Sequence, residues 1–242
     1  MTADEIRALL ARDPDRSELT LQWLANQGVV TAQVMFGRIL LEGNGTIKSA
    51  AAALAWFERA GKKGHAEGTM MVGRCLEHGW GTDPDPAQAF FCYAHAAKLG
   101  NDWAQYNVAR MYLDGHGVAR DAERAAYWYA KAAEQGHARA MNLLARCYEE
   151  GWGVMRNTFK ANDWYRRSAE AGYFRGQYNW AMALVAAGRV AEAANWLKRA
   201  AHDATPDVKA AIVSYAAQIE HPAMQAIASP LDETSRALDT SE

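Results

Sequence analysis

Four arginines recur along the chain at a constant spacing of 36 residues. They are Arg38, Arg74, Arg110 and Arg146. A guanidinium group donates two parallel hydrogen bonds to a carboxylate and also donates to peptide carbonyls, so a row of arginines suits the binding of a peptide or an acidic side chain. Four residues after each arginine stands a polar residue, in the order Glu42, His78, Asp114 and Glu150. Pairs at this spacing stabilise a helix by only about 0.2–0.5 kcal/mol, so solvated surface charge is an equally weighted interpretation.

A second recurring set stands between paired glycines. Trp80 and Trp152 each lie in a Gly-Trp-Gly triplet, and the corresponding triplets of two other repeats contain Asn44 and His116. Glycines allow a sharp chain reversal, so the residue between them is expected at the edge of the structure. Two interpretations stay open for Trp80, His116 and Trp152. They form an exposed edge ladder that serves as a second contact surface, or each lies flat on a neighbouring loop.

The residue types needed for catalysis or metal binding do not converge in this sequence. Three cysteines, Cys75, Cys92 and Cys147, lack the spacing of a zinc or redox site, and Cys75 and Cys147 occupy one repeat position that suits core packing. His65 and His137 also share one repeat position, so we interpret them as parts of the repeat and not as metal ligands. No metalloprotease, phosphate-loop or nucleophile-elbow motif is present. We therefore predict no catalytic residues, no metal, no cofactor and no enzymatic activity.

Composition narrows the class of partner. Of 242 residues, half are apolar and 22% are charged, and the net charge is −2 with both signs interspersed. Such a chain creates no field that attracts nucleic acid or an anionic membrane. The first residues lack the apolar run of a signal peptide, and no segment is long and apolar enough to cross a bilayer. We expect a cytoplasmic protein with no membrane insertion.

The spacing of 36 residues divides most of the chain into repeats, each predicted to form two helices. The repeats are 30–65, 66–101, 102–137 and 138–173, followed by a shortened repeat at 174–205. The first helix of each repeat is expected to end at a glycine in the left-handed conformation: Gly43, Gly79, Gly115 or Gly151. The second helix is expected to begin after a capping residue: Ser49, Asp85, Asp121 or Asn157. One column of the second helix, Trp56, Cys92, Trp128 and Trp164, is expected to fill the space between hairpins.

The two ends depart from the repeat. Residues 1–29 are expected to form an N-terminal helical cap from helices at 3–12 and 17–27. Residues 206–228 are expected to form a C-terminal cap, with one helix from Pro206 to Glu220 that stops before Pro222. The segment 229–242 is polar and acidic, and we expect it to be disordered.

The repeat resembles the Sel1-like repeat family, a relative of the tetratricopeptide repeats. The residues that carry the resemblance in the third repeat are Val108, Ala109, Tyr112, Gly115, Gly117, Val118, Trp128, Ala132, Ala133 and Gly136. The first repeat lacks the valine after Gly45, and the second has Cys92 in place of the tryptophan. The resemblance implies an all-α fold, a right-handed α-solenoid of helix-turn-helix repeats, and a bacterial adaptor that holds other proteins.

Tetratricopeptide-like stacks use the first helix of each repeat to line a concave groove, and the resemblance implies the same here. The residues expected to line this groove are Arg38, Arg74, Arg110, Arg146, Met70, Trp103, Tyr106, Asn142 and Tyr178. Aromatic residues and arginine are enriched where binding energy concentrates, and the repeat motif requires no aromatic at Trp103. Trp103 is therefore the favoured contact, and its alternative role is packing between adjacent first helices.

These patterns predict a non-catalytic adaptor or scaffold that binds a peptide or helix of another protein in the concave groove, and that is itself a monomer or weak homodimer. One alternative is a structural or self-associating scaffold that uses the exposed loop edge. A third is a hydrolase or β-lactam-binding protein, as some cysteine-rich members of the family are. Those members depend on paired cysteines in successive repeats, and this chain has no such pairs.

Overall fold

The computed structural model describes residues 1–229, and within that range every regular element is a helix. The predicted all-α class and its helical hairpins are confirmed. Apart from Ser229, the tail predicted to be disordered lies outside the described residues. The chain divides into two compact units, one from Met1 to Gln135 and a second that begins at Gly136.

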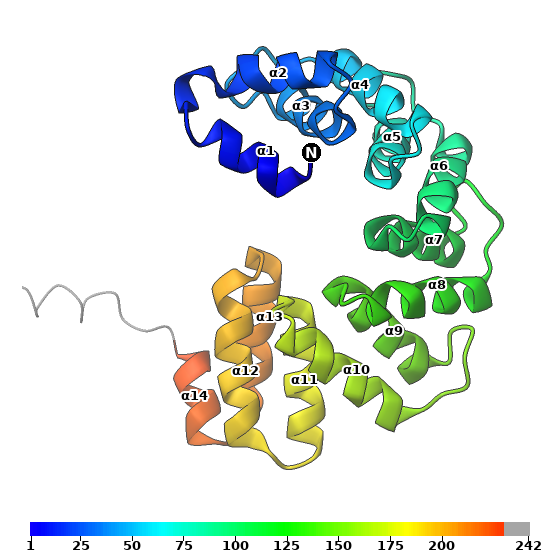
Figure 1. The fold of residues 1–242 in the computed structure, drawn as a ribbon. Coiled ribbons are helices and arrows are strands. Elements are labelled where there is room, and N and C mark those ends of the chain that lie inside the picture. Colours follow the sequence, from blue (N-terminus) through cyan, green and yellow to red (C-terminus); the bar gives the residue numbers. More distant parts are fainter. Residues whose placement is uncertain (230–242) are drawn as a thin grey trace, which may run out of the picture. The chain divides into compact units, whose positions relative to one another are not determined.

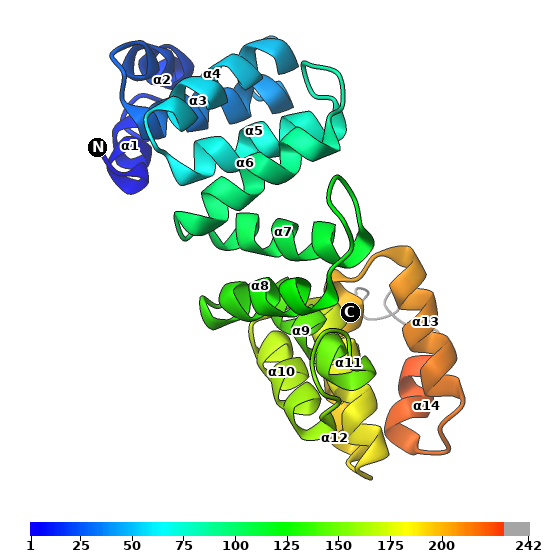
Figure 2. The same cartoon turned by 90° about the vertical axis from the view of Figure 1, so that its right-hand side faces the viewer.

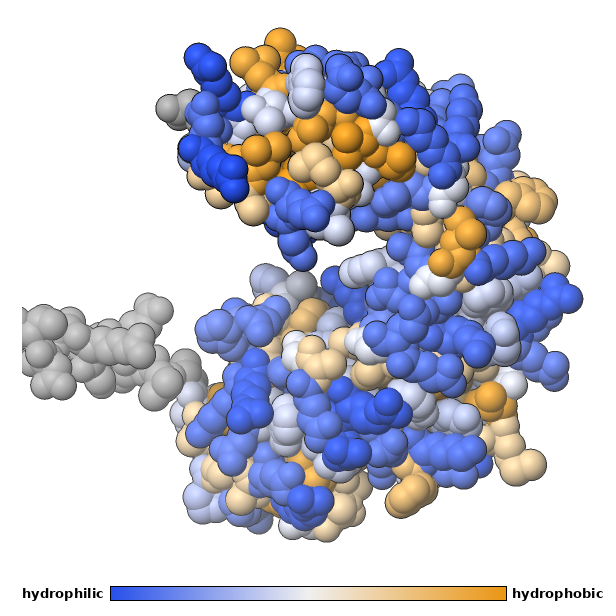
Figure 3. Space-filling model, viewed as in Figure 1, coloured by the Kyte–Doolittle hydropathy of each residue, from blue (hydrophilic) through white to orange (hydrophobic). Residues whose placement is uncertain are grey.

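The first unit stacks three hairpins behind an N-terminal pair of helices (Figures 1 and 2). Its helices are α1 (Ala3–Leu10), α2 (Ser17–Asn26), α3 (Val30–Glu42), α4 (Ala50–Lys62), α5 (Ala66–His78), α6 (Pro86–Lys98), α7 (Asp102–Asp114) and α8 (Ala122–Glu134), with a short 3-10 turn at Pro14–Arg16. In Figure 1 the first helices α3 and α5 lie on the inner side of this unit, and the second helices α4 and α6 lie on its outer side. Apolar side chains gather on one face of the unit around α1 and α3, while most of the remaining surface in Figure 3 is hydrophilic.

The second unit continues the pattern and then changes it. Its helices are α9 (Ala138–Glu150), α10 (Thr158–Glu170), α11 (Phe174–Ala186), α12 (Val190–Asp203), α13 (Pro206–Ala217) and α14 (Pro222–Ala228). The prediction of one C-terminal helix is wrong, because Pro222 begins a further helix instead of ending the fold. Proline suits the first helical position, and the His221 side chain accepts a hydrogen bond from the Ala223 amide at 3.2 Å. Met224 of α14 is fully buried in a core with Leu184, Leu197 and Ile212.

Helix ends follow the local sequence. The four predicted glycines adopt the left-handed conformation at the ends of α3, α5, α7 and α9. The four predicted capping side chains accept hydrogen bonds at the starts of α4, α6, α8 and α10. These predictions are confirmed, and the short loop between each first and second helix is thereby fixed at both ends.

The aromatic column that fills the interior is not the predicted one. Trp56, Trp128 and Trp164 are only partly buried. The fully or almost fully buried column lies one residue further along the second helix, at Phe57, Tyr93, Tyr129 and Tyr165. One residue corresponds to about 100° of rotation on a helix, so this column points more directly into the core than the tryptophans do. Trp56 still contacts the first helix of its hairpin, with its ring centroid 5.7 Å from that of Phe36.

Small residues on the first helix receive these buried rings. A Cβ atom added at Gly37 would lie 2.5 Å from Phe57, and one added at Gly73 would lie 2.9 Å from Tyr93. The absence of a side chain at these two positions lets the aromatic ring rest directly on the facing backbone. This close packing of large against small residues joins the two helices of each hairpin.

Candidate functional site

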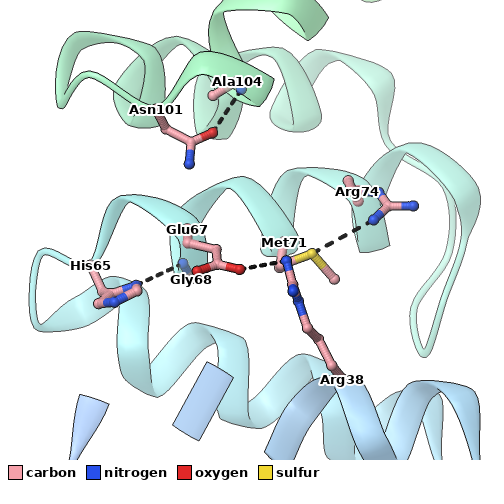
Figure 4. A network of polar contacts seen from close by, with 8 residues as sticks. All are labelled: Arg38, His65, Glu67, Gly68, Met71, Arg74, Asn101 and Ala104. Atoms are coloured by element: carbon pink, nitrogen blue, oxygen red, sulfur yellow. Dashed lines mark hydrogen bonds and ion pairs between the residues drawn. The ribbon is translucent and has the colours of Figure 1, made fainter. Parts of the chain in front are cut away.

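The recurring arginines have two kinds of partner, although they share one repeat position. Arg38 of α3 forms an ion pair with Glu67 of α5, and Figure 4 shows its side chain reaching across to that carboxylate. Arg110 of α7 forms an ion pair with Glu77, also on α5. Helix α5 therefore receives one arginine from the hairpin before it and one from the hairpin after it. Both pairs connect neighbouring repeats.

The Arg110–Glu77 pair is the more buried of the two. The Glu77 side chain is 6% exposed and that of Arg110 is 29% exposed, against 35% and 48% for Glu67 and Arg38. The Tyr93 hydroxyl donates a second hydrogen bond to Glu77 at 2.8 Å. Burial alone would raise the pKa of Glu77, but the hydrogen bonds from Arg110 and Tyr93 outweigh it and hold that pKa below its ordinary value.

Arg74 and Arg146 instead cover the tryptophans of their own loops. The guanidinium carbon of Arg74 lies 5.1 Å from the Trp80 ring centroid, and that of Arg146 lies 4.9 Å from the Trp152 ring centroid. The His78 ring also lies beside Trp80, with the ring centroids 4.8 Å apart. A cation over an indole face is a favourable arrangement, with tryptophan the strongest of the aromatic partners.

The edge ladder of Trp80, His116 and Trp152 is less exposed than expected. His116 is exposed, but Trp80 and Trp152 are partly buried. The correction has a local cause, because each tryptophan is covered by the arginine six residues before it. The first and third repeats have asparagine and histidine in this loop and so no indole ring, and their arginines pair with glutamates instead.

Some residues recur in every second repeat, at a spacing of 72 residues, in addition to those that recur every 36 residues. The second and fourth repeats share a tryptophan in the loop, a cysteine five residues before it and a glutamate three residues before it. In both repeats that glutamate accepts a hydrogen bond from the buried tyrosine of the same hairpin, with Tyr165 and Glu149 2.6 Å apart in the fourth. The sequence contained this signal, since the two Gly-Trp-Gly triplets lie 72 residues apart.

Two of the predicted groove residues lie in the interior. Met70 and Asn142 are each 4% exposed, so the expectation that they line an open surface is corrected. The Asn142 side chain accepts a hydrogen bond from Asn179 at 2.8 Å and so connects α9 with α11. Buried amide groups need such partners, which explains a polar residue at this position.

The aromatic groove candidates differ in exposure. Trp103 is 44% exposed, and its ring centroid lies 6.1 Å from that of Tyr106 in an edge-to-face arrangement. Tyr106 and Tyr178 are partly buried, and Tyr178 packs edge-to-face against Tyr215 of α13. Trp103 is therefore the most accessible aromatic residue of the predicted set.

The cysteines and repeated histidines have structural surroundings. Burial raises the pKa of Cys75 to about 11 and that of Cys147 to about 12, so both thiols stay protonated and weakly nucleophilic at neutral pH. His65 and His137 cap helices, since their Nδ1 atoms accept hydrogen bonds from the amides of Gly68 and Ala140 at 3.3 and 3.2 Å. Within residues 1–229, no three His, Cys, Asp or Glu side chains gather as metal ligands would.

Among the helices described between residues 1 and 229, none combines the length and the apolar character that a membrane span requires.

Comparison with known proteins gives a consistent result. The family model for the Sel1 repeat matches residues 30–65, 66–101, 104–137, 138–173 and 190–203. A search of curated proteins finds no match. Among solved structures, a protective antigen of uropathogenic Escherichia coli with this repeat fold is 29% identical at a TM-score of 0.72. The similarity covers 82% of this chain but only 43% of the antigen, so the chain spans less than half of that protein.

Two further structures resemble the chain over most of their own length. A Sel1 repeat protein from Oxalobacter formigenes is 28% identical at a TM-score of 0.69, and the similarity covers 78% of this chain and 79% of that one. An immunity protein from Pseudomonas aeruginosa is 20% identical at a TM-score of 0.60, with coverage of 86% and 78%. At that identity the likeness concerns the fold alone.

Proposed function

The chain belongs to the Sel1 repeat family, and from that membership we propose that it is a non-catalytic adaptor that binds a peptide or helix of a partner protein. The binding surface is the exposed face of the first helices, which carries Arg38, Arg74 and Trp103. Repeat stacks of this kind offer extended surfaces for protein binding, because each hairpin adds the same side-chain positions to one face.

The observation that carries this proposal is the exposure of Trp103 on the face that bears the arginines. Trp103 and the arginine position are the second and ninth residues of a repeat, seven residues apart, and so lie on one side of the first helix. Trp103 is 44% exposed and the Arg38 side chain is 48% exposed. Exposed tryptophan and arginine are the residue types that most often dominate binding energy.

The test compares capture of partner proteins by the wild type and by the double variant Arg38→Ala, Trp103→Ala. Neither substitution leaves a buried charge unpaired, whereas removing Arg110 would strand Glu77. Tagged protein is incubated with an extract of the source organism, and captured proteins are identified by mass spectrometry. We expect the double variant to lose a specific partner while helical content and melting temperature stay unchanged.

A matched control makes the result interpretable. Phe91→Ala removes a side chain that is 70% exposed on α6, a second helix. This variant is expected to keep the partner. Equal capture by the double variant and the wild type would contradict the proposal.

Self-association through the loop edge is a second candidate, and exposed apolar side chains favour it. Met155 and Phe159 follow the Trp152 loop and are 90% and 84% exposed. Apolar side chains of this size are costly to leave in water when they lie together. Sedimentation velocity tests this candidate by comparing the oligomeric state of the wild type with that of the double variant Met155→Ser, Phe159→Ser. A monomeric wild type across the micromolar range would exclude it.

A further inference from the structure

The arginine position of this repeat already binds carboxylates within the chain. At two of its four occurrences, Arg38 and Arg110, the guanidinium pairs with a glutamate from a neighbouring hairpin. The position therefore projects its guanidinium to where a carboxylate can reach it. The other two members occupy the same repeat position.

Arg74 and Arg146 have no such ligand. Among the described residues no carboxylate lies within ion-pair distance of either guanidinium. The nearby glutamates are engaged elsewhere, since Glu77 binds Arg110 and Tyr93, and Glu149 binds Tyr165. Glu150 follows Arg146 by four residues yet forms no ion pair with it in the described structure.

Contact with a tryptophan ring prepares these two guanidinium groups for a ligand. The indole lies about 5 Å from the guanidinium carbon in both pairs and reduces the contact of the cation with water on that side. A guanidinium carries five N–H donors, and those that are not directed at the ring stay available to an acceptor. Within residues 1–229, Arg74 also donates a hydrogen bond to the sulfur of Met71 at 3.8 Å, which is a weak acceptor (Figure 4).

We propose that the pairs Arg74–Trp80 and Arg146–Trp152 are two carboxylate-binding positions, one in each unit, that take acidic groups of the partner protein. This inference rests on the proposed adaptor function and adds the chemistry of the ligand. Two members of the arginine row are filled by the chain's own glutamates, and two accept a carboxylate from outside. The tryptophan holds the guanidinium in place, and the bidentate hydrogen bond supplies the selectivity for a carboxylate over an amide.

The test follows the indole N–H signals of Trp80 and Trp152 by nuclear magnetic resonance. Three synthetic peptides serve as probes. The first alternates glycine with glutamate and has both ends blocked, the second replaces every glutamate with glutamine, and the third is the glutamine peptide with a free C-terminal carboxylate. The first and third peptides distinguish a side-chain carboxylate from a chain terminus as the source of the ligand.

We expect the glutamate peptide to shift both signals saturably and the blocked glutamine peptide to shift neither. Arg74→Gln is expected to raise the apparent Kd measured at the Trp80 signal at least tenfold and to leave the Kd measured at the Trp152 signal unchanged. Arg146→Gln is expected to have the reverse effect. Arg199→Gln is the matched control, because its guanidinium carbon also lies near an indole, 4.8 Å from the Trp196 ring centroid, but on α12 and outside both loops, and its titration should equal that of the wild type. A response to the third peptide alone would assign the site to C-terminal carboxylates.

The proposal is overturned if no carboxylate peptide shifts these signals up to about 5 mM, a concentration that detects binding as weak as roughly −3 kcal/mol. It is also overturned if the shifts persist at the wild-type Kd in Arg74→Gln and Arg146→Gln. A negative result for the carboxylate sites does not contradict the adaptor function, because that function is tested independently. Its test is partner capture by the wild type and the loss of capture in Arg38→Ala, Trp103→Ala. Circular dichroism of each variant confirms that the helices are intact.

Discussion

At the scale of single residues, identical arginines differ in what they contribute because their surroundings differ. Arg110 neutralises a carboxylate that is almost fully removed from water, whereas Arg38 neutralises one at the surface. Breaking a buried pair leaves an uncompensated charge, while breaking an exposed one leaves two solvated groups. The repeat position alone therefore does not set the energetic role of its occupant.

This difference predicts unequal costs for one chemical change. Arg110→Ala should lower the free energy of unfolding by about 2–4 kcal/mol, because Glu77 stays buried without its main partner. Arg38→Ala should lower it by less than about 1 kcal/mol, because both groups stay hydrated. Urea unfolding followed by circular dichroism measures both. Equal losses would show that the Glu77 pair is no more important than a surface pair.

The same pair predicts a dependence on pH. The folded-state pKa of Glu77 lies below its ordinary value of 4.5, so its ionised form stabilises the folded protein. That contribution is complete above pH 4.5 and is lost as the pH falls through the lower pKa of the folded state. We expect Glu77→Gln to be less stable than the wild type at pH 7 and the difference to shrink below pH 4.5. A difference that stays constant down to pH 3 would rule out this role of the carboxylate.

At the scale of elements, the loop between the two helices of a hairpin also joins it to the preceding hairpin. A Cβ atom at Gly117 would lie 2.2 Å from the carbonyl oxygen of Pro86, at the start of α6. The equivalent atom at Gly81 would lie 2.5 Å from the carbonyl of Ala50, at the start of α4. In these two triplets the first glycine ends a helix, and the second lets the loop rest on the neighbouring repeat.

Alanine at Gly117 is expected to separate these two hairpins. The substitution combines a clash with the Pro86 carbonyl and a φ of +70°, and we expect a loss of about 2–4 kcal/mol in unfolding free energy. Gly64→Ala is the matched control, because Gly64 has a φ of +79° but nothing within 4 Å of the added atom. Only the conformational cost of about 1–2 kcal/mol applies there. Thermal unfolding compares the two, and an equal loss would exclude a role for the loop contact.

At the scale of the whole molecule, each unit contains its own buried core and depends on contacts between adjacent hairpins. In the second unit the helices after the last repeat close the core through Ile212 and Met224, both fully buried. In stacked repeats a local defect spreads through neighbouring interfaces and weakens with distance along the stack. A destabilising substitution in the core of one unit should therefore leave the local stability of the other unit unchanged.

Met224→Asp tests this independence. A charge placed in the core of the second unit should detach α14 and raise amide hydrogen exchange at least tenfold in α12 to α14, while exchange in α3 to α7 stays as in the wild type. Gln225→Asp, at the exposed neighbouring position, is the control and should leave exchange unchanged. Hydrogen exchange with mass spectrometry resolves the segments. An equal increase in α3 to α7 would show that the chain unfolds as one cooperative body.

The sequence by itself determined the repeat and, within the repeats, the helices and their ends. Gly115 ends α7 and Asp121 begins α8 through hydrogen bonds that close within a few residues, and such local chemistry leaves a periodic trace in the sequence. Only the tertiary structure decided which side chains meet. The rotation of the second helix buried Tyr129 in place of Trp128, and neighbouring hairpins brought Glu77 to Arg110 while Arg74 turned to Trp80. Contacts between hairpins depend on the direction and distance of elements that are far apart along the chain, and a repeat period contains neither quantity.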